Sequence, residues 1–79
     1  MASKEKKIAM LTLTGETLFG ERWQTDLARA LKLSDARRIR QWLSGDRVMP
    51  DNIIRQLLDL LTAQKSMIDA VLLDINSRS

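Results

Sequence analysis

The sequence predicts an all-α fold, a compact bundle of four or five short helices. Apolar residues recur three and four positions apart over residues 24–31, 35–44 and 50–75, which is the spacing of one helix face. The apolar fraction of 44% and the charged fraction of 29% are those of an ordinary globular domain. Because the 79 residues include no cysteine or histidine, stability must come from packed aliphatic side chains, with self-association as a further source.

We expect residues 1–7 to be disordered, because they are charged and lack apolar periodicity. The apolar run that begins at Ile8 stops at Thr12, too early for the core of a signal peptide. No stretch approaches the ~20 apolar residues of a membrane span. Residues 8–79 are therefore expected to form a single cytoplasmic domain that does not contact membranes.

The part of the chain before the first tryptophan has the weakest periodicity. Residues 8–13 fit either a helix or a strand, and helix is the favoured alternative. Thr14 is placed to cap a short helical turn that Gly20 would end in the left-handed conformation. Phe19 should then face the core, with Trp23 packed beside it.

The central region predicts two short amphipathic helices, 24–31 and 35–44, joined by a tight turn. Either Ser34 or Asp35 is suited to cap the second helix. Residues spaced at 100° around this helix separate into two faces. The inward face holds Ala36, Ile39, Trp42 and Leu43, and the outward face holds Arg37, Arg38, Arg40, Gln41 and Ser44.

The C-terminal helical segment spans residues 50–75, with Pro50 suited to its first position. Ser66 and Asp69 resemble a capping box, so this segment is either one long helix or two. Its apolar stripes consist of Ile54, Leu57, Leu58 and Leu61, and of Ile68, Val71, Leu72 and Ile75.

Positive charge is concentrated in the central region. Residues 22–47 carry a formal charge of +4, whereas residues 1–21 carry 0 and residues 48–79 carry −1. A local excess of this kind indicates a surface that binds a polyanion.

The outward face of helix 35–44 has the donors that duplex DNA requires. Arginine can pair with guanine O6 and N7, and glutamine can pair with adenine in the same bidentate way. The alternative interpretation is an ordinary solvated helix face, since runs of charge are common on protein surfaces.

Enzymatic function is not expected. The glycines at 15 and 20 have the spacing of a phosphate-binding loop, but Glu21 and Arg22 stand where that loop needs lysine and serine or threonine. The carboxylates are scattered, and no histidine or cysteine can serve as base or nucleophile. We expect no catalytic residue, no metal site, no cofactor and no small-molecule substrate.

Residues 20–50 resemble the helix-turn-helix of Cro/repressor-type, lambda-repressor-like DNA-binding proteins of bacteria and phages. The resemblance rests on Gly20-Glu21-Arg22-Trp23-Gln24-Thr25-Asp26-Leu27-Ala28, Leu33-Ser34, Ile39 with Trp42, Ser44-Gly45, and Pro50. It implies a bundle in which the second and third helices form the motif and the later ones support it or make a dimer. It also matches Gln24 to the family's phosphate-contacting glutamine, and it places Arg37, Arg38 and Gln41 outward on the recognition helix.

The sequence departs from the family at the turn between the two helices. Lys32 stands where the family usually has glycine, so this residue is either left-handed, with some strain, or the turn is built differently. Leu33 and Ile39 are six apart instead of five. If Asp35 caps the third helix, the turn absorbs the extra residue and the inward register is kept.

The predicted function is sequence-specific binding of double-stranded DNA, as a homodimeric transcriptional regulator that inserts helix 35–44 into the major groove. Two alternatives remain open: a protein adaptor that uses the Leu-rich C-terminal segment, and a helical module for RNA or single strands. The candidate DNA-binding residues are Arg22, Gln24, Thr25, Ser34, Arg37, Arg38, Arg40, Gln41, Ser44 and Arg47.

Overall fold

The computed structural model describes residues 3–78, which form four α-helices and no β-strand. The prediction of an all-α fold is therefore confirmed. The helices are α1 (Lys4–Phe19), α2 (Trp23–Ala30), α3 (Arg37–Ser44) and α4 (Asp51–Arg78).

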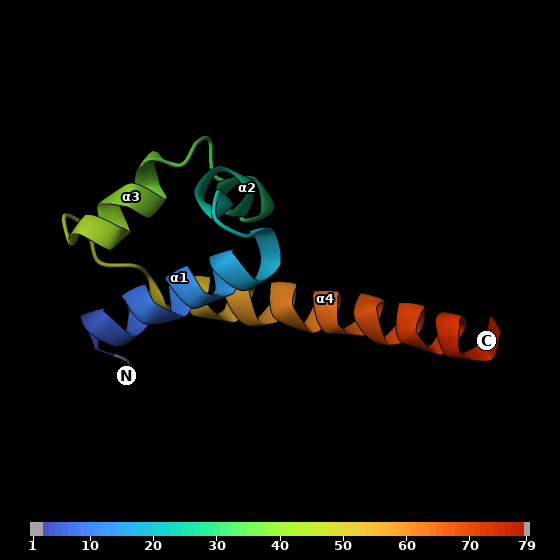
Figure 1. Cartoon of the computed structure of the whole chain (residues 1–79). Coiled ribbons are helices and arrows are strands. Elements are labelled where there is room, and N and C mark those ends of the chain that lie inside the picture. The colour runs from blue at the N-terminus through green and yellow to red at the C-terminus, as the bar shows by residue number, and fades with distance from the viewer. Residues whose placement is uncertain (1–2, 79) are drawn as a thin grey trace.

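The helices form a small body with one long extension. Figure 1 shows α2 and α3 on one side of the layer made by α1 and the first part of α4, while the rest of α4 runs on beyond the body. The described chain is accordingly elongated, with extents of 51 × 26 × 19 Å. The predicted bundle of short helices is wrong for α4, whose 28 residues are unbroken at Ser66. Of the two alternatives for residues 50–75, the structure has the single long helix.

Helix α1 begins earlier and is more regular than predicted. The Ser3 hydroxyl caps it by accepting a hydrogen bond from the Lys6 N–H at 3.3 Å. The expectation of disorder over residues 1–7 is thus wrong for residues 4–7, and residues 1–2 lie outside the described part. Thr14 lies inside the helix and does not start a new turn. Gly20 ends α1 with a φ of 79°, but its ψ of −154° is not that of a left-handed helical residue.

The core lies where α1, α2, α3 and the first half of α4 meet. Both tryptophans are buried in it, as predicted, and Ile39 of α3 is fully inaccessible. On α4 the buried face is turned by about one residue from the predicted stripe, since Ile53 is buried and Leu58 is 58% exposed. The buried apolar residues are Leu11, Trp23, Leu27, Ala28, Leu31, Ala36, Ile39, Trp42, Met49, Ile53 and Leu57.

Gly15 allows α2 to approach α1 closely. A Cβ atom at Gly15 would overlap the Trp23 indole ring. Gly15→Ala should therefore lower the free energy of unfolding by about 1–3 kcal/mol through overpacking, although alanine in a helix normally stabilises by about 0.5–1 kcal/mol. Urea unfolding measures this difference, and a variant as stable as the wild type would show that the indole is not held against the helix.

The turn after α2 has a left-handed residue that is not glycine. Lys32 has a φ of 61°, and its N–H donates to the Arg29 carbonyl at 3.0 Å, while the Leu33 N–H donates to the Ala28 carbonyl at 2.9 Å. This pair of hydrogen bonds is a Schellman motif, in which glycine is preferred at the left-handed position. Of the two alternatives for this turn, the structure has the strained one.

Relieving this strain should stabilise the protein. A residue with a side chain in the left-handed conformation costs about 1–2 kcal/mol of stability, and replacing it by glycine removes this cost. The greater flexibility of glycine in the unfolded chain offsets about 0.5–1 kcal/mol of the stability gained. We expect Lys32→Gly to raise the free energy of unfolding by about 0.5–1 kcal/mol. Lys32→Ala, which removes the same charge and keeps the Cβ atom, is the control in chemical denaturation. Equal stability of the two variants would contradict the strain.

Candidate nucleic-acid interface

Helix α3 presents one packed face and one exposed face. Ala36, Ile39 and Trp42 are buried, and residues placed at 100° intervals put Arg37 and Gln41 at the centre of the opposite face. The outward-facing residues are exposed at Arg37, Arg38, Arg40 and Ser44 and half-buried at Gln41. The predicted division of this helix into two faces is confirmed, although the regular helix begins at Arg37 and not at 35.

The arginines of α3 have no carboxylate partner among residues 3–78. Their guanidinium donors are therefore available to a ligand, unlike those of Arg29 and Arg78. The four ion pairs of the described chain are Lys7–Asp51 at 2.8 Å, Arg29–Asp26 at 3.4 Å, Lys65–Asp69 at 3.2 Å and Arg78–Asp74 at 3.0 Å.

Two shallow hollows lie on either side of the exposed face of α3 and gather seven of the ten predicted residues. Ser34 and Asp35 line both hollows. The first hollow is lined by Ser34, Asp35, Arg37, Arg38, Gln41 and Arg47, and the second by Thr25, Arg29, Leu33, Ser34, Asp35, Ala36 and Arg40.

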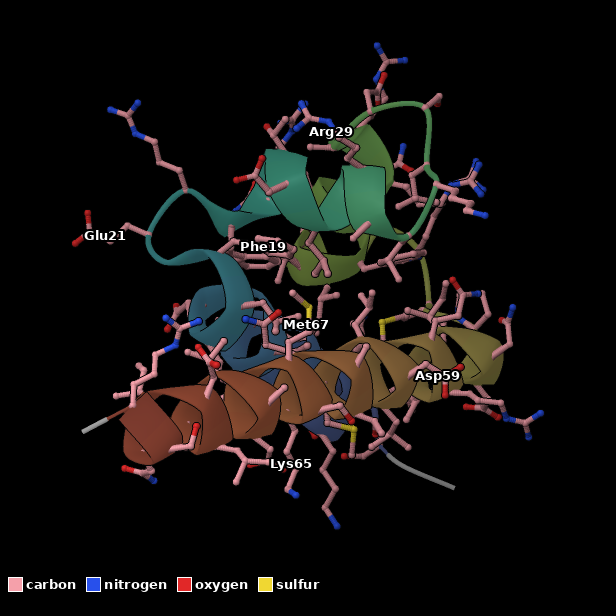
Figure 2. The ribbon with its side chains drawn as sticks, turned by 90° about the vertical axis from the view of Figure 1, so that its right-hand side faces the viewer. Phe19, Glu21, Arg29, Asp59, Lys65 and Met67 are labelled. Carbon is pink, nitrogen blue, oxygen red and sulfur yellow. The ribbon has the colours of Figure 1, made fainter. Side chains whose placement is uncertain are left out.

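Sequence reasoning missed Arg29. Its side chain is 77% exposed on the outer surface of α2 (Figure 2) and shares the second hollow with Thr25 and Arg40. Its pairing with Asp26 across an exposed 3.4 Å contact is weak, because solvent screens such pairs. The four-residue spacing from Thr25, which places both on one face of α2, is the sequence signal for this residue.

The N-terminus of α2 has no side-chain cap. Arg22 is the N-cap residue, and its side chain does not accept a hydrogen bond from the first turn. Thr25 is exposed and Gln24 is half-buried in that turn, whose free N–H groups suit an anion such as a phosphate. Arg22 and Gln24 lie near this terminus and do not line either hollow.

The N-terminus of α3 is occupied by Asp35. Its carboxylate accepts a hydrogen bond from the Arg37 N–H at 2.8 Å. The N-cap position itself is held by Ala36, which makes no side-chain capping bond, so the prediction that Ser34 or Asp35 is the cap is wrong by one residue for Asp35 and by two for Ser34. Ile39 remains inward on α3. The start of α3 therefore already carries a carboxylate, whereas the start of α2 has no side-chain cap.

Ser44 has a local role. Its hydroxyl donates to the Gln41 carbonyl at 3.2 Å and accepts from the Asp46 N–H at 3.4 Å. These bonds hold the end of α3, where Gly45 adopts the left-handed conformation with a φ of 87°. Ser44 is on the exposed face, but its hydroxyl is already engaged.

Two lysines of α1 hold the loop that follows α3. The Lys4 ammonium donates to the Gly45 carbonyl at 3.1 Å, and the buried Lys7 ammonium donates to the Met49 carbonyl at 2.9 Å and pairs with Asp51 at 2.8 Å. These contacts link α1 to both ends of the loop. They fix how α3 and its arginines sit on the body, and nothing in the charged N-terminal sequence indicated them.

Comparison with family models, curated proteins and solved structures gives no match. The resemblance of residues 20–50 to Cro/repressor-type proteins therefore stays a prediction from the residues themselves. Among residues 3–78, no helix is long and apolar enough to cross a membrane. The same residues contain no group of three or more acidic, histidine or cysteine side chains that could hold a metal ion.

The Lys7–Asp51 pair should make stability depend on pH. The hydrogen bond from Lys7, and then its charge, lower the pKa of the Asp51 carboxyl from the ordinary 3.8. A lowered folded-state pKa stabilises the protein above about pH 4, and this contribution is lost as the pH falls through the folded-state value. Thermal unfolding of wild type and Asp51→Asn should differ most near pH 6 and converge toward pH 2. A constant difference at all pH values would contradict this assignment.

Proposed function

We propose that the chain binds double-stranded DNA in a sequence-specific manner and regulates transcription, with α3 inserted into the major groove. The single observation that supports this most is the row of exposed arginines on α3 that lack carboxylate partners among residues 3–78. A helix fits the major groove, which is about 12 Å wide. In this proposal α2, the turn and α3 act as a helix-turn-helix.

The positions around α3 suggest different roles for its polar side chains. Arg37 and Gln41 lie at the centre of the exposed face, where a groove-bound helix is nearest the base edges. Arg38 and Arg40 flank them on opposite sides, in reach of the two DNA backbones. Arg38 shares its hollow with Arg47, and Arg40 shares the other with Thr25 and Arg29.

The open N-terminus of α2 supports the same orientation. Its unpaired N–H groups, with Arg22 immediately before them and Thr25 in the first turn, would bind a phosphate of the strand on the Arg40 side. Gln24 would support this contact. In this proposal the residues named here bind DNA and do not catalyse a reaction on it. A homodimer would bind two half-sites whose centres are about one helical turn, ~34 Å, apart.

Fluorescence anisotropy with labelled duplex DNA tests the proposal. We expect binding that weakens steeply as salt rises, because released counterions contribute to affinity, and we expect RNA and single strands to compete poorly. Absence of binding to duplex DNA at low salt would contradict the proposal. Stronger competition by RNA or single strands would favour the alternative nucleic-acid module instead.

A further inference from the structure

The second half of α4 has an apolar face that nothing in the described chain covers. Every residue from 62 to 78 is exposed. Met67, Ile68, Val71 and Leu72 together with Gln64 line an apolar hollow on this half, and Ile75 is 56% exposed. Exposed apolar patches of this kind mark interaction surfaces.

This face continues the face that packs into the core. On the first half of α4, Ile53 and Leu57 are buried beneath the body, and Val71 follows Leu57 by fourteen residues, two heptads along the same side of the helix. In Figure 2 Met67 lies on the side of α4 that faces the body, and Lys65 lies on the opposite side. A partner that covers this face should therefore present apolar side chains, as the core does to the first half of α4.

We infer that the partner is α4 of a second copy, packed antiparallel on this face. The row Leu61, Gln64, Ile68, Leu72 and Ile75 has successive gaps of three, four, four and three residues, so its spacing is the same when read from either end. A reversed copy centred on Ile68 therefore places Leu61 opposite Ile75 of the other chain. The side chains of this row are therefore in register with the same row on a reversed copy of α4.

The position of the helical body on α4 determines whether the partner helix runs parallel or antiparallel. A parallel partner helix, lying along the same face, would continue into the space that the body occupies above Ile53 and Leu57. An antiparallel partner instead continues away from the body, past the C-terminal end of α4. Only the antiparallel arrangement lets both copies cover this face without displacing α1.

Charge and area are compatible with such a dimer. The charged residues beyond Leu61 pair within the helix as Lys65–Asp69 and Asp74–Arg78, so the two faces meet without net repulsion. The row from Leu61 to Ile75 is about 21 Å long at 1.5 Å per residue. Two such faces bury on the order of 1,000 Å², the lower limit for a specific interface, which predicts a reversible dimer.

The inference supplies the contact for the proposed dimer, and it does not depend on DNA binding. Sedimentation or light scattering of the full chain without DNA, from about 1 to 200 μM, should show a mass that rises from 9.0 kDa toward twice that value. Ile68→Glu should remain monomeric. Leu73→Glu makes the same change on the opposite side of α4, where Leu73 is 72% exposed, and should dimerise like the wild type.

Cross-linking tests the direction, because the chain has no cysteine of its own. Mixed Leu61→Cys and Ile75→Cys chains should form a disulfide between them, and Ile75→Cys alone should not. Self-linking of Ile75→Cys would overturn the antiparallel arrangement. A constant mass of 9.0 kDa, or equal loss of the dimer in Leu73→Glu, would overturn the interface and leave duplex binding by α3 untouched.

Discussion

Arg38→Ala combined with Arg40→Ala is expected to lower affinity for duplex DNA about 50-fold to 100-fold at 0.1 M salt. Each phosphate contact contributes about 0.9 to the slope of log K against log salt, which corresponds to roughly tenfold in affinity at 0.1 M. The two side chains flank the exposed face of α3 and have no ion-pair partner among residues 3–78. Anisotropy titrations at several salt concentrations should therefore show a slope smaller by about 2.

The matched control removes two arginines from α4. Arg55→Ala combined with Arg78→Ala makes the same change in net charge at exposed positions away from α3. This control should bind duplex DNA nearly as well as the wild type. If both double variants lose the same affinity, the attraction is a property of net charge, and α3 is not the surface that contacts the phosphates.

Ile39→Ala is expected to lower the free energy of unfolding by about 2–5 kcal/mol. Ile39 is 0% exposed and lies among the residues that join α3 to the rest of the core, and a large-to-small change at such a site loses burial and leaves a cavity. A domain of this size is stable by only about 4–12 kcal/mol. The melting temperature should fall by about 10 °C or more, measured by circular dichroism.

Leu73→Ala is the control for that substitution. Leu73 is 72% exposed, so truncating it should change stability by no more than about 0.5 kcal/mol. A small effect of Ile39→Ala, similar to that of Leu73→Ala, would contradict the inward orientation of Ile39. That orientation is what places the arginines of α3 outward.

The local pattern of the sequence was enough to predict the faces of α2 and α3. Ile39 and Trp42 lie inward because helical periodicity depends only on neighbouring residues. The cap of α3 was predicted as Ser34 or Asp35, because both have suitable side chains. The N-cap residue is Ala36, and Asp35 bonds to the first turn from one residue earlier.

The features that depend on distant residues could not be predicted. Lys7 looked like part of a solvated tail, because its partners Met49 and Asp51 lie more than forty residues along the chain. On α4, periodicity indicated an apolar face but not its phase on the core, which the packing of Ile53 sets. Nor could it indicate which part of that face the body covers.

Selection of bound duplexes from a random pool tests the central proposal most directly. If α3 reads base edges through Arg37 and Gln41, the pool should become enriched in one short motif. A homodimer should repeat that motif as an inverted pair, with centres about one helical turn apart. A pool that binds the protein but stays random through successive rounds would contradict sequence-specific recognition.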